Sequence, residues 1–225
     1  MYVQTEVYRA DTARPYYSVS QFKFELAEGE NGYVIRKVIE SNVKEMTAPD
    51  LEKLQLNSGE KQEPLFTVQD VPKQNIKNNN IRLGSLVWNQ KTDQVIFSVQ
   101  EMRDETKSAK DQTNLSAVTL WIYDRKNKSF TFLDRIESLN NEKNIVIQGI
   151  SISPDGKYLA ADVFSEDHLS VKYVLIYDLK EKKQLARLDQ AQSFLWQGNR
   201  FIIQRNNNNQ SMLYYFDPKT KKITY

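Results

Sequence analysis

The chain has 225 residues, 40% hydrophobic and 11% aromatic, so it is long enough for one large domain or two small ones with a sizeable core. Its 31 basic and 29 acidic residues nearly cancel, a balance that gives no reason to expect a nucleic-acid binder, which usually has a strongly basic face. The chain has no Cys and one His, His168. This composition excludes disulfides, cysteine nucleophiles, thiolate zinc sites and any Ser-His-Asp triad built on another histidine.

The N-terminal segment carries too many charges to be a secretory leader. Glu6, Arg9 and Asp11 interrupt residues 1–17, whereas a signal peptide needs a continuous apolar stretch. No later apolar run approaches the roughly 20 residues that span a bilayer, so no transmembrane segment is expected. The absence of Cys fits a reducing cytosol and equally a secreted protein without unpaired thiols. The compartment is therefore open between the cytoplasm and a bacterial extracytoplasmic space reached with a leader or anchor since removed.

Two kinds of β-hairpin alternate along the chain, each with a run of β-branched and aromatic residues, a polar turn and a second run. The first unit opens with a hairpin over residues 20–38 that turns between Gly29 and Gly32. Its second hairpin spans 51–68, although a short helix over 48–56 competes with the first strand of that hairpin. In the later units the first hairpin covers 85–99, 149–163 and 193–203, and the second covers 118–133, 173–188 and 212–225.

Four strands per unit predict an all-β fold, a β-propeller of four-stranded antiparallel blades. We expect one domain over residues 1–225 and about four blades, at 18–68, 84–133, 149–188 and 193–225. Closed propellers typically have about 4–8 blades. The chain is therefore either a closed small ring, with segment 1–8 as a possible closing strand, or part of a larger propeller with further blades.

One turn carries a family resemblance. In Ser153-Pro154-Asp155-Gly156-Lys157, Pro presets φ, Asp bonds to the backbone and Gly accepts a left-handed conformation. This turn resembles the signature of TolB-type, WD-like β-propeller repeats, and the strands that end in Asp124 and Asp178 resemble the Trp-Asp strand of that superfamily. The resemblance covers about residues 84–225. It implies a propeller that binds proteins, peptides or glycans or that gates a peptidase, often without catalysis.

The connections predict two unlike faces. The turns between the first and second strands, and between the third and fourth, are short and share one face. The other connections are longer and share the opposite face, where loops on a rigid scaffold usually bind ligands, although tolerated insertions would look the same. We expect the long connections at 40–50, 69–84, 100–117, 134–148, 164–172 and 204–211.

Acidic residues gather in two of the long connections. A pair of carboxylates about 5–10 Å apart could hydrolyse glycosides, and the lone histidine could act as a general base. No spacing matches a calcium loop, and lysines interleave with the acids, so a solvated loop is favoured over a catalytic pair. We expect no catalytic residue, metal site or cofactor, and take as candidate ligand-binding residues Glu101, Asp104, Glu105, Glu166, Asp167 and His168.

The short turns between third and fourth strands are basic and occupy equivalent positions. Together they could form a positive collar for an anionic partner such as a phosphate-rich polymer or a lipid headgroup. Lysine in such turns also serves solubility alone, and that interpretation is favoured. The residues are Arg125, Lys126 and Lys128, then Lys180, Lys182 and Lys183, then Lys219, Lys221 and Lys222.

Three apolar residues hold equivalent places at the ends of first strands. Trp88, Ile152 and Trp196 precede the first turn of their units, and we expect them on innermost strands, buried between blades rather than forming a stacking surface. The pattern as a whole favours a non-catalytic binding or scaffolding propeller that recognises a protein, peptide or glycan through the long loops. The alternative is an enzyme-associated propeller, either a glycan-acting enzyme that uses loop carboxylates or the accessory domain of a serine peptidase.

Overall fold

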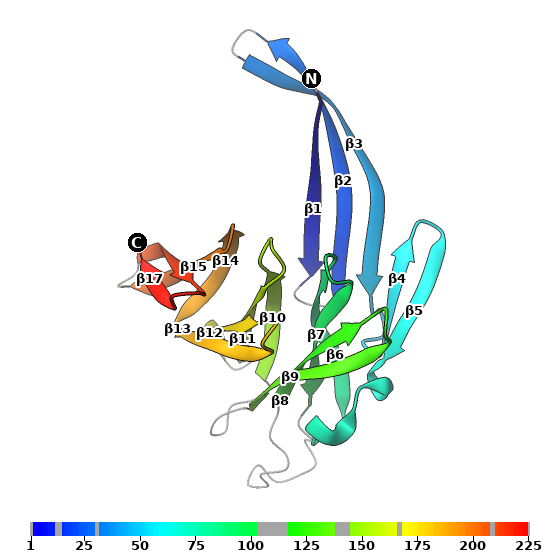
Figure 1. Cartoon of the computed structure of the whole chain (residues 1–225), viewed down its shortest axis with the longest axis vertical. Coiled ribbons are helices and arrows are strands. Elements are labelled where there is room, and N and C mark those ends of the chain that lie inside the picture. Colours follow the sequence, from blue (N-terminus) through cyan, green and yellow to red (C-terminus); the bar gives the residue numbers. More distant parts are fainter. Residues whose placement is uncertain are drawn as a thin grey trace.

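The computed structural model describes residues 2–11, 15–29, 32–102, 117–137, 145–165, 168–207 and 210–224. These ranges fold into strands β1 to β17 and two short 3₁₀ helices, and the strands form four antiparallel sheets (Figure 1). The all-β fold of antiparallel blades predicted from the sequence is confirmed. No helix in the described ranges has the length and apolar character needed to cross a membrane.

Each sheet is built from strands that follow one another in sequence. The first sheet holds five strands and the second holds four, with the two 3₁₀ helices between them. The first consists of β1 (Tyr2–Asp11), β2 (Tyr16–Gly29), β3 (Gly32–Thr47), β4 (Lys53–Ser58) and β5 (Lys61–Thr67). The helices are η1 (Val68–Asp70) and η2 (Lys73–Asn75). The second sheet consists of β6 (Ile81–Asn89), β7 (Gln94–Glu101), β8 (Ala117–Asp124) and β9 (Ser129–Glu137).

The third and fourth sheets have four strands each, in sequence order. The third consists of β10 (Ile145–Ile152), β11 (Tyr158–Ser165), β12 (His168–Asp178) and β13 (Lys183–Asp189). The fourth consists of β14 (Ala191–Gln197), β15 (Arg200–Asn207), β16 (Gln210–Asp217) and β17 (Lys222–Thr224).

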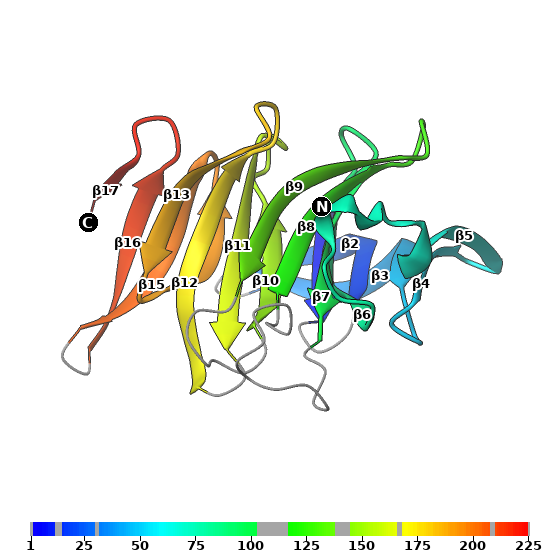
Figure 2. The same cartoon turned by 90° about the horizontal axis from the view of Figure 1, so that it is seen from below.

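The sheets stand side by side in an open row, with the first and fourth at its two ends (Figures 1 and 2). β6 packs against β2 and β10, and β12 packs against β14, so the recorded packing joins each sheet to the next. Polar contacts reinforce two of these joints. Tyr177 of the third sheet donates to Asp134 of the second at 2.8 Å. Across the last joint, the backbone N–H and hydroxyl of Ser193 donate to Asp162 at 3.0 and 2.7 Å.

One buried hydrophobic cluster joins the first sheet to the second and third. The central strands β7 and β8 are buried almost throughout, as expected for strands covered on both faces. Phe66 of β5 lies 4.8 Å from Phe97, 4.7 Å from Tyr123 and 5.2 Å from Phe130, measured between ring centroids. Aromatic rings at these distances attract one another beyond their burial. This cluster fixes the first blade on the second.

Segment 1–8 does not extend the last sheet. β1 pairs with β2 along its whole length, from Tyr2 opposite Glu25 to Asp11 opposite Tyr16, and so adds a fifth strand to the first sheet. The physical reason is proximity in sequence. An alternating segment fits any free strand edge, and closing a loop of a few residues costs much less entropy than closing one of about 200.

Several expected long connections are shorter than predicted because the strands on each side extend into them. In the connection expected at 134–148, β9 reaches Glu137 and β10 starts at Ile145. β3 continues to Thr47, into the expected connection 40–50. β11 reaches Ser165 and β12 starts at His168, and β15 and β16 extend in the same way into 204–211. The choice left open over 48–56 is settled in favour of strand β4, which follows a turn with Leu51 at φ 60°.

The turns between third and fourth strands share one construction. Asp124, Asp178 and Asp217 each accept a backbone N–H at 2.9 Å, from Asn127, Glu181 and Lys219 respectively. In each turn the last residue is a lysine in the left-handed region, with φ of 49° at Lys128, 51° at Lys182 and 56° at Lys221. An aspartate that bonds the backbone of its own turn stabilises that turn.

These turn carboxylates make stability depend on acidity. The backbone N–H of Asn127 holds the pKa of Asp124 below its ordinary 3.8, and that of Lys219 does the same for the pKa of Asp217. A lowered folded-state pKa stabilises the fold above the ordinary pKa, and this stabilisation disappears as the pH falls through the folded-state value. The variant Asp124→Ala/Asp217→Ala should therefore lose less stability than the wild type when acidified from about pH 5 to about pH 3, measured by urea unfolding. An equal loss in both proteins would contradict this role, and Lys126→Ala is the control.

Candidate functional site

A groove lies between the second and third sheets, where β6 and β10 end and their turns begin. Its volume is about 450 Å³. It opens on the face of the short turns, opposite the face on which we expected ligands to bind. Its lining comes from three sheets and consists of Tyr17, residues 87–91, residues 150–154 and Gly156.

Aromatic and aliphatic side chains form the body of the groove. Trp88 is buried, and its indole N–H donates to Asp93 at 3.1 Å. Two cations lie by its ring, the Lys44 ammonium at 5.7 Å and the Arg125 guanidinium at 5.3 Å from the centroid. A hydrogen bond and two cation–π contacts hold the indole in one orientation. This wall is therefore preformed.

The opposite wall is the turn at residues 153–157. The Ser153 hydroxyl donates to Asp155 at 2.7 Å and accepts the Tyr158 N–H at 2.9 Å. Burial alone would raise the pKa of Asp155, but hydrogen bonds from Ser153 and Lys157 hold that pKa below its ordinary value. Gly156 has φ 78°, and a Cβ there would lie 3.1 Å from the Asn89 amide. Only glycine fits this turn without strain.

Polar contacts tie this turn to β6 across the mouth of the groove. The Asn89 amide donates to the Gly156 carbonyl at 3.1 Å, and the Lys91 ammonium donates to the Pro154 carbonyl. The two walls therefore belong to one rigid unit, with an apolar interior and polar groups at the rim. Such a groove suits an apolar side chain carried by a polar backbone.

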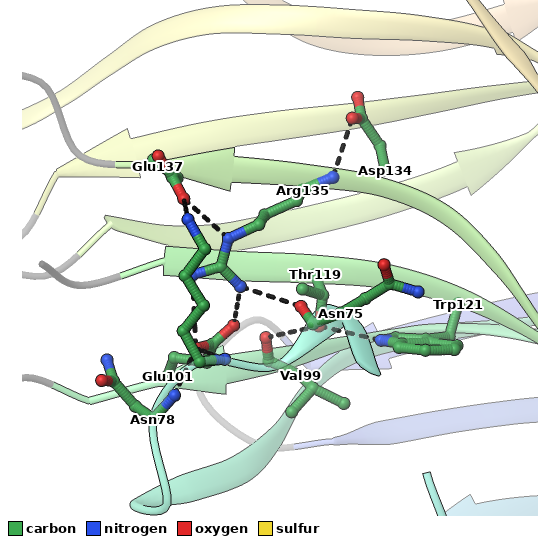
Figure 3. Close-up of polar contacts among 10 residues, drawn as sticks. Asn75, Asn78, Val99, Glu101, Thr119, Trp121, Asp134, Arg135 and Glu137 are labelled. Carbon is green, nitrogen blue, oxygen red and sulfur yellow. Dashed lines mark hydrogen bonds and ion pairs between the residues drawn. The ribbon is translucent and has the colours of Figure 1, made fainter. Parts of the chain in front are cut away.

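Of the predicted site residues, Glu101 is the one whose surroundings are fully described. It ends β7, and its side chain is 0% exposed. One carboxylate oxygen accepts the backbone N–H groups of Lys77 and Asn78 at 2.8 and 2.9 Å (Figure 3). The carboxylate also forms an ion pair with Arg135 of β9. It therefore contacts other groups of this chain and does not lie in the open loop that we expected.

The Arg135 guanidinium joins this carboxylate to the end of η2. It donates to the Asn75 carbonyl at 2.9 Å and to Glu137 at 2.8 Å. Lys77 donates to the same Glu137 oxygen at 2.7 Å. Hydrogen bonds from Arg135 and Lys77 lower the pKa of Glu137. The Glu101 cluster, consisting of Lys77, Glu101, Arg135 and Glu137, therefore fastens the link between the first two sheets to the second.

The side chains of the other predicted site residues lie outside the description. Asp104 and Glu105 belong to 103–116, outside the described residues, and so do Glu166 and Asp167. His168 begins β12 opposite Ser165, and its side chain is outside the description. Within the described ranges, no group of three or more His, Asp or Glu side chains is placed to hold a metal ion.

The equivalent residues Trp88, Ile152 and Trp196 lie, as predicted, at the ends of the first strands β6, β10 and β14. Trp88 is buried, whereas Ile152 and Trp196 are half-buried, so their predicted burial is confirmed only in part. The Trp196 indole donates to Ser151 at 3.1 Å and stacks on Tyr158 with a centroid distance of 6.4 Å. It packs the fourth sheet on the third. Trp88 and Ile152 line the groove at the joint between the second and third sheets.

Comparisons with known proteins add remote likenesses. No family model matches the chain, and no curated protein matches it. The chain is similar to TolB from Acinetobacter baumannii, at 14% identity and a TM-score of 0.46, over 99% of this chain and 57% of that one. It is also similar to the tricorn protease, at 8% identity and a TM-score of 0.47, over 98% of this chain and 25% of that one. An oligogalacturonate lyase in complex with manganese is similar at 9% identity and a TM-score of 0.37, over 100% of this chain and 84% of that one.

Proposed function

We propose that the chain is a non-catalytic binding or scaffolding propeller that recognises a segment of a protein partner. The observation that carries this proposal is the groove between β6 and β10, which has a fixed indole on one side and a fixed turn on the other. Its apolar interior favours a peptide side chain over a glycan, whose hydroxyl groups would need more polar partners than the interior offers. The resemblance of the turn at 153–157 to TolB-type repeats supports the same class of function.

Binding through the long connections stays a prediction, because residues 103–116 and 138–144 lie outside the description. The enzyme alternative has less support. Glu101, one of its loop carboxylates, is buried and paired with Arg135, so a catalytic pair would have to come from Asp104, Glu105 or the acids at 166–167. We therefore favour binding over catalysis.

A peptide selection tests the groove. Random peptides displayed on phage and selected on the full chain should converge on sequences with a large apolar residue. Binding of a selected peptide, measured by fluorescence anisotropy, should weaken at least about tenfold, or about 1.4 kcal/mol, in Ile152→Arg. Gln90→Arg, at an exposed rim position, should weaken binding in the same way without affecting the core.

The control for this selection is Lys182→Ala, which changes a turn outside the groove. Circular dichroism establishes that each variant is folded. Equal affinity of the selected peptides for wild type, Ile152→Arg and Gln90→Arg would contradict a groove site. A selection that converges on no apolar-containing sequence would contradict the proposed function itself.

A further inference from the structure

The hairpin β2–β3 extends far beyond the blades as an arm. It is the first hairpin of the first sheet, and it leaves the row of sheets on the side of the short turns (Figure 1). β4 pairs with β3 only from Lys44 to Thr47, so within the described ranges the outer edge of residues 32–43 has no neighbouring strand. We call residues 21–29 and 32–43 the arm.

The strand register groups apolar residues of both strands on one face of the arm. Val38 lies opposite Phe24, and Ile35 lies opposite Leu26, because Arg36 forms a bulge between them. The bulge puts Ile35 and Val38 on the same face although they are three residues apart. Tyr33, opposite Glu28, continues this face toward the tip.

The β3 residues of this face are exposed. Tyr33 is 60% exposed, Ile35 59% and Val38 51%. A contiguous exposed apolar patch marks an interaction site. The arm therefore has a face for a partner.

Charge selects the kind of partner. Glu28 and Glu40 lie on the apolar face, at its two ends, opposite Tyr33 and Phe22. Two such faces packed on each other would bring these acids together, in either direction. An apolar surface with lysines beside it suits this face better. The groove between β6 and β10 is such a surface, with the exposed side chains of Lys44 and Lys91 next to Trp88.

We propose that the apolar face of the arm docks into the groove of a second copy of this chain, and that the second copy returns the same contact. Arm and groove both open on the side of the short turns, so a two-fold axis can exchange the arms of two molecules that face each other. The inference rests on the proposed function of the groove, and it names the segment that the groove recognises.

Light scattering on the full chain over a range of concentrations tests the proposal. The wild type should form a dimer. Val38→Ser and Ile35→Ser, on the apolar face of the arm, should raise the dimer dissociation constant at least tenfold. Gln90→Glu, which adds a carboxylate to the groove beside the acids of the docked arm, should do the same. The matched control is Val34→Ser, which changes an equally exposed residue opposite Ala27 on the other face of the arm and should leave the dissociation constant unchanged.

Mixing supplies a second measurement. Ile35→Ser keeps an intact groove and Gln90→Glu keeps an intact arm, so the mixture should dimerise better than either variant alone. A monomer at every concentration would overturn the proposal. So would a dimer insensitive to Gln90→Glu, which would mean that arms pair with each other. A monomer that still selects groove-dependent peptides would overturn this inference and leave the proposed function standing.

Discussion

Replacing Arg135 by methionine is expected to lower the free energy of unfolding by about 3–5 kcal/mol, as when one partner of a buried ion pair is removed. The Glu101 carboxylate has no exposed surface, and Arg135 is the cation that pairs with it. Without the guanidinium, the carboxylate keeps two backbone donors, Lys77 and Asn78, but its charge is no longer compensated. Urea unfolding followed by tryptophan fluorescence measures the loss.

A double variant separates lost pairing from lost packing. In Arg135→Met/Glu101→Leu the buried charge is gone, and apolar replacement of a whole buried ion pair is often neutral. The double variant should therefore be more stable than Arg135→Met alone. A double variant that is less stable by the sum of both single losses would show that the two residues act independently.

Replacing Trp196 by alanine is expected to cost about 3 kcal/mol, at the lower end of the range for Trp→Ala because the side chain is only half-buried. The indole packs on Phe201 at 4.6 Å and on Tyr158 at 6.4 Å, measured between ring centroids. Its removal leaves a cavity between the third and fourth sheets and frees Ser151 from its hydrogen bond. Thermal and urea unfolding both report the change.

The matched comparison is Lys182→Ala, in an exposed turn of the third sheet. That change should stay within about ±0.5 kcal/mol, as is usual for surface substitutions. Alanine adopts the left-handed conformation of this position about as well as lysine, so the substitution changes the backbone contribution to stability very little. Equal losses for Trp196→Ala and Lys182→Ala would contradict the packing of the fourth sheet on the third.

The repeat could be predicted because its signals are local. The turn at 153–157 and the aspartates at the ends of β8, β12 and β16 each fix a hairpin within a few residues. The bulge at Arg36 was not predictable. Strict alternation puts Ile35 and Val38 on opposite faces, and only the register with β2 brings them together.

The site was predicted less well, because it depends on contacts between distant segments. Glu101 looked like a loop acid, and its partner Arg135 is 34 residues away on another strand. The groove was missed for the same reason. Its walls come from strands of different sheets, and no sequence pattern states how two sheets are placed against each other.

The packing of each sheet on the next has a consequence for cooperativity. When contacts join only neighbours in a row, stability behaves as a chain of coupled units, and the end units open first. The Glu101 cluster then sets the boundary between the first unit and the second. It binds residues 75–78 to β7 and β9 rather than to the first sheet. The first sheet, with its arm, can therefore open while residues 75–78 stay folded on the second sheet. An exchanged arm can then leave its partner while the other three sheets stay folded.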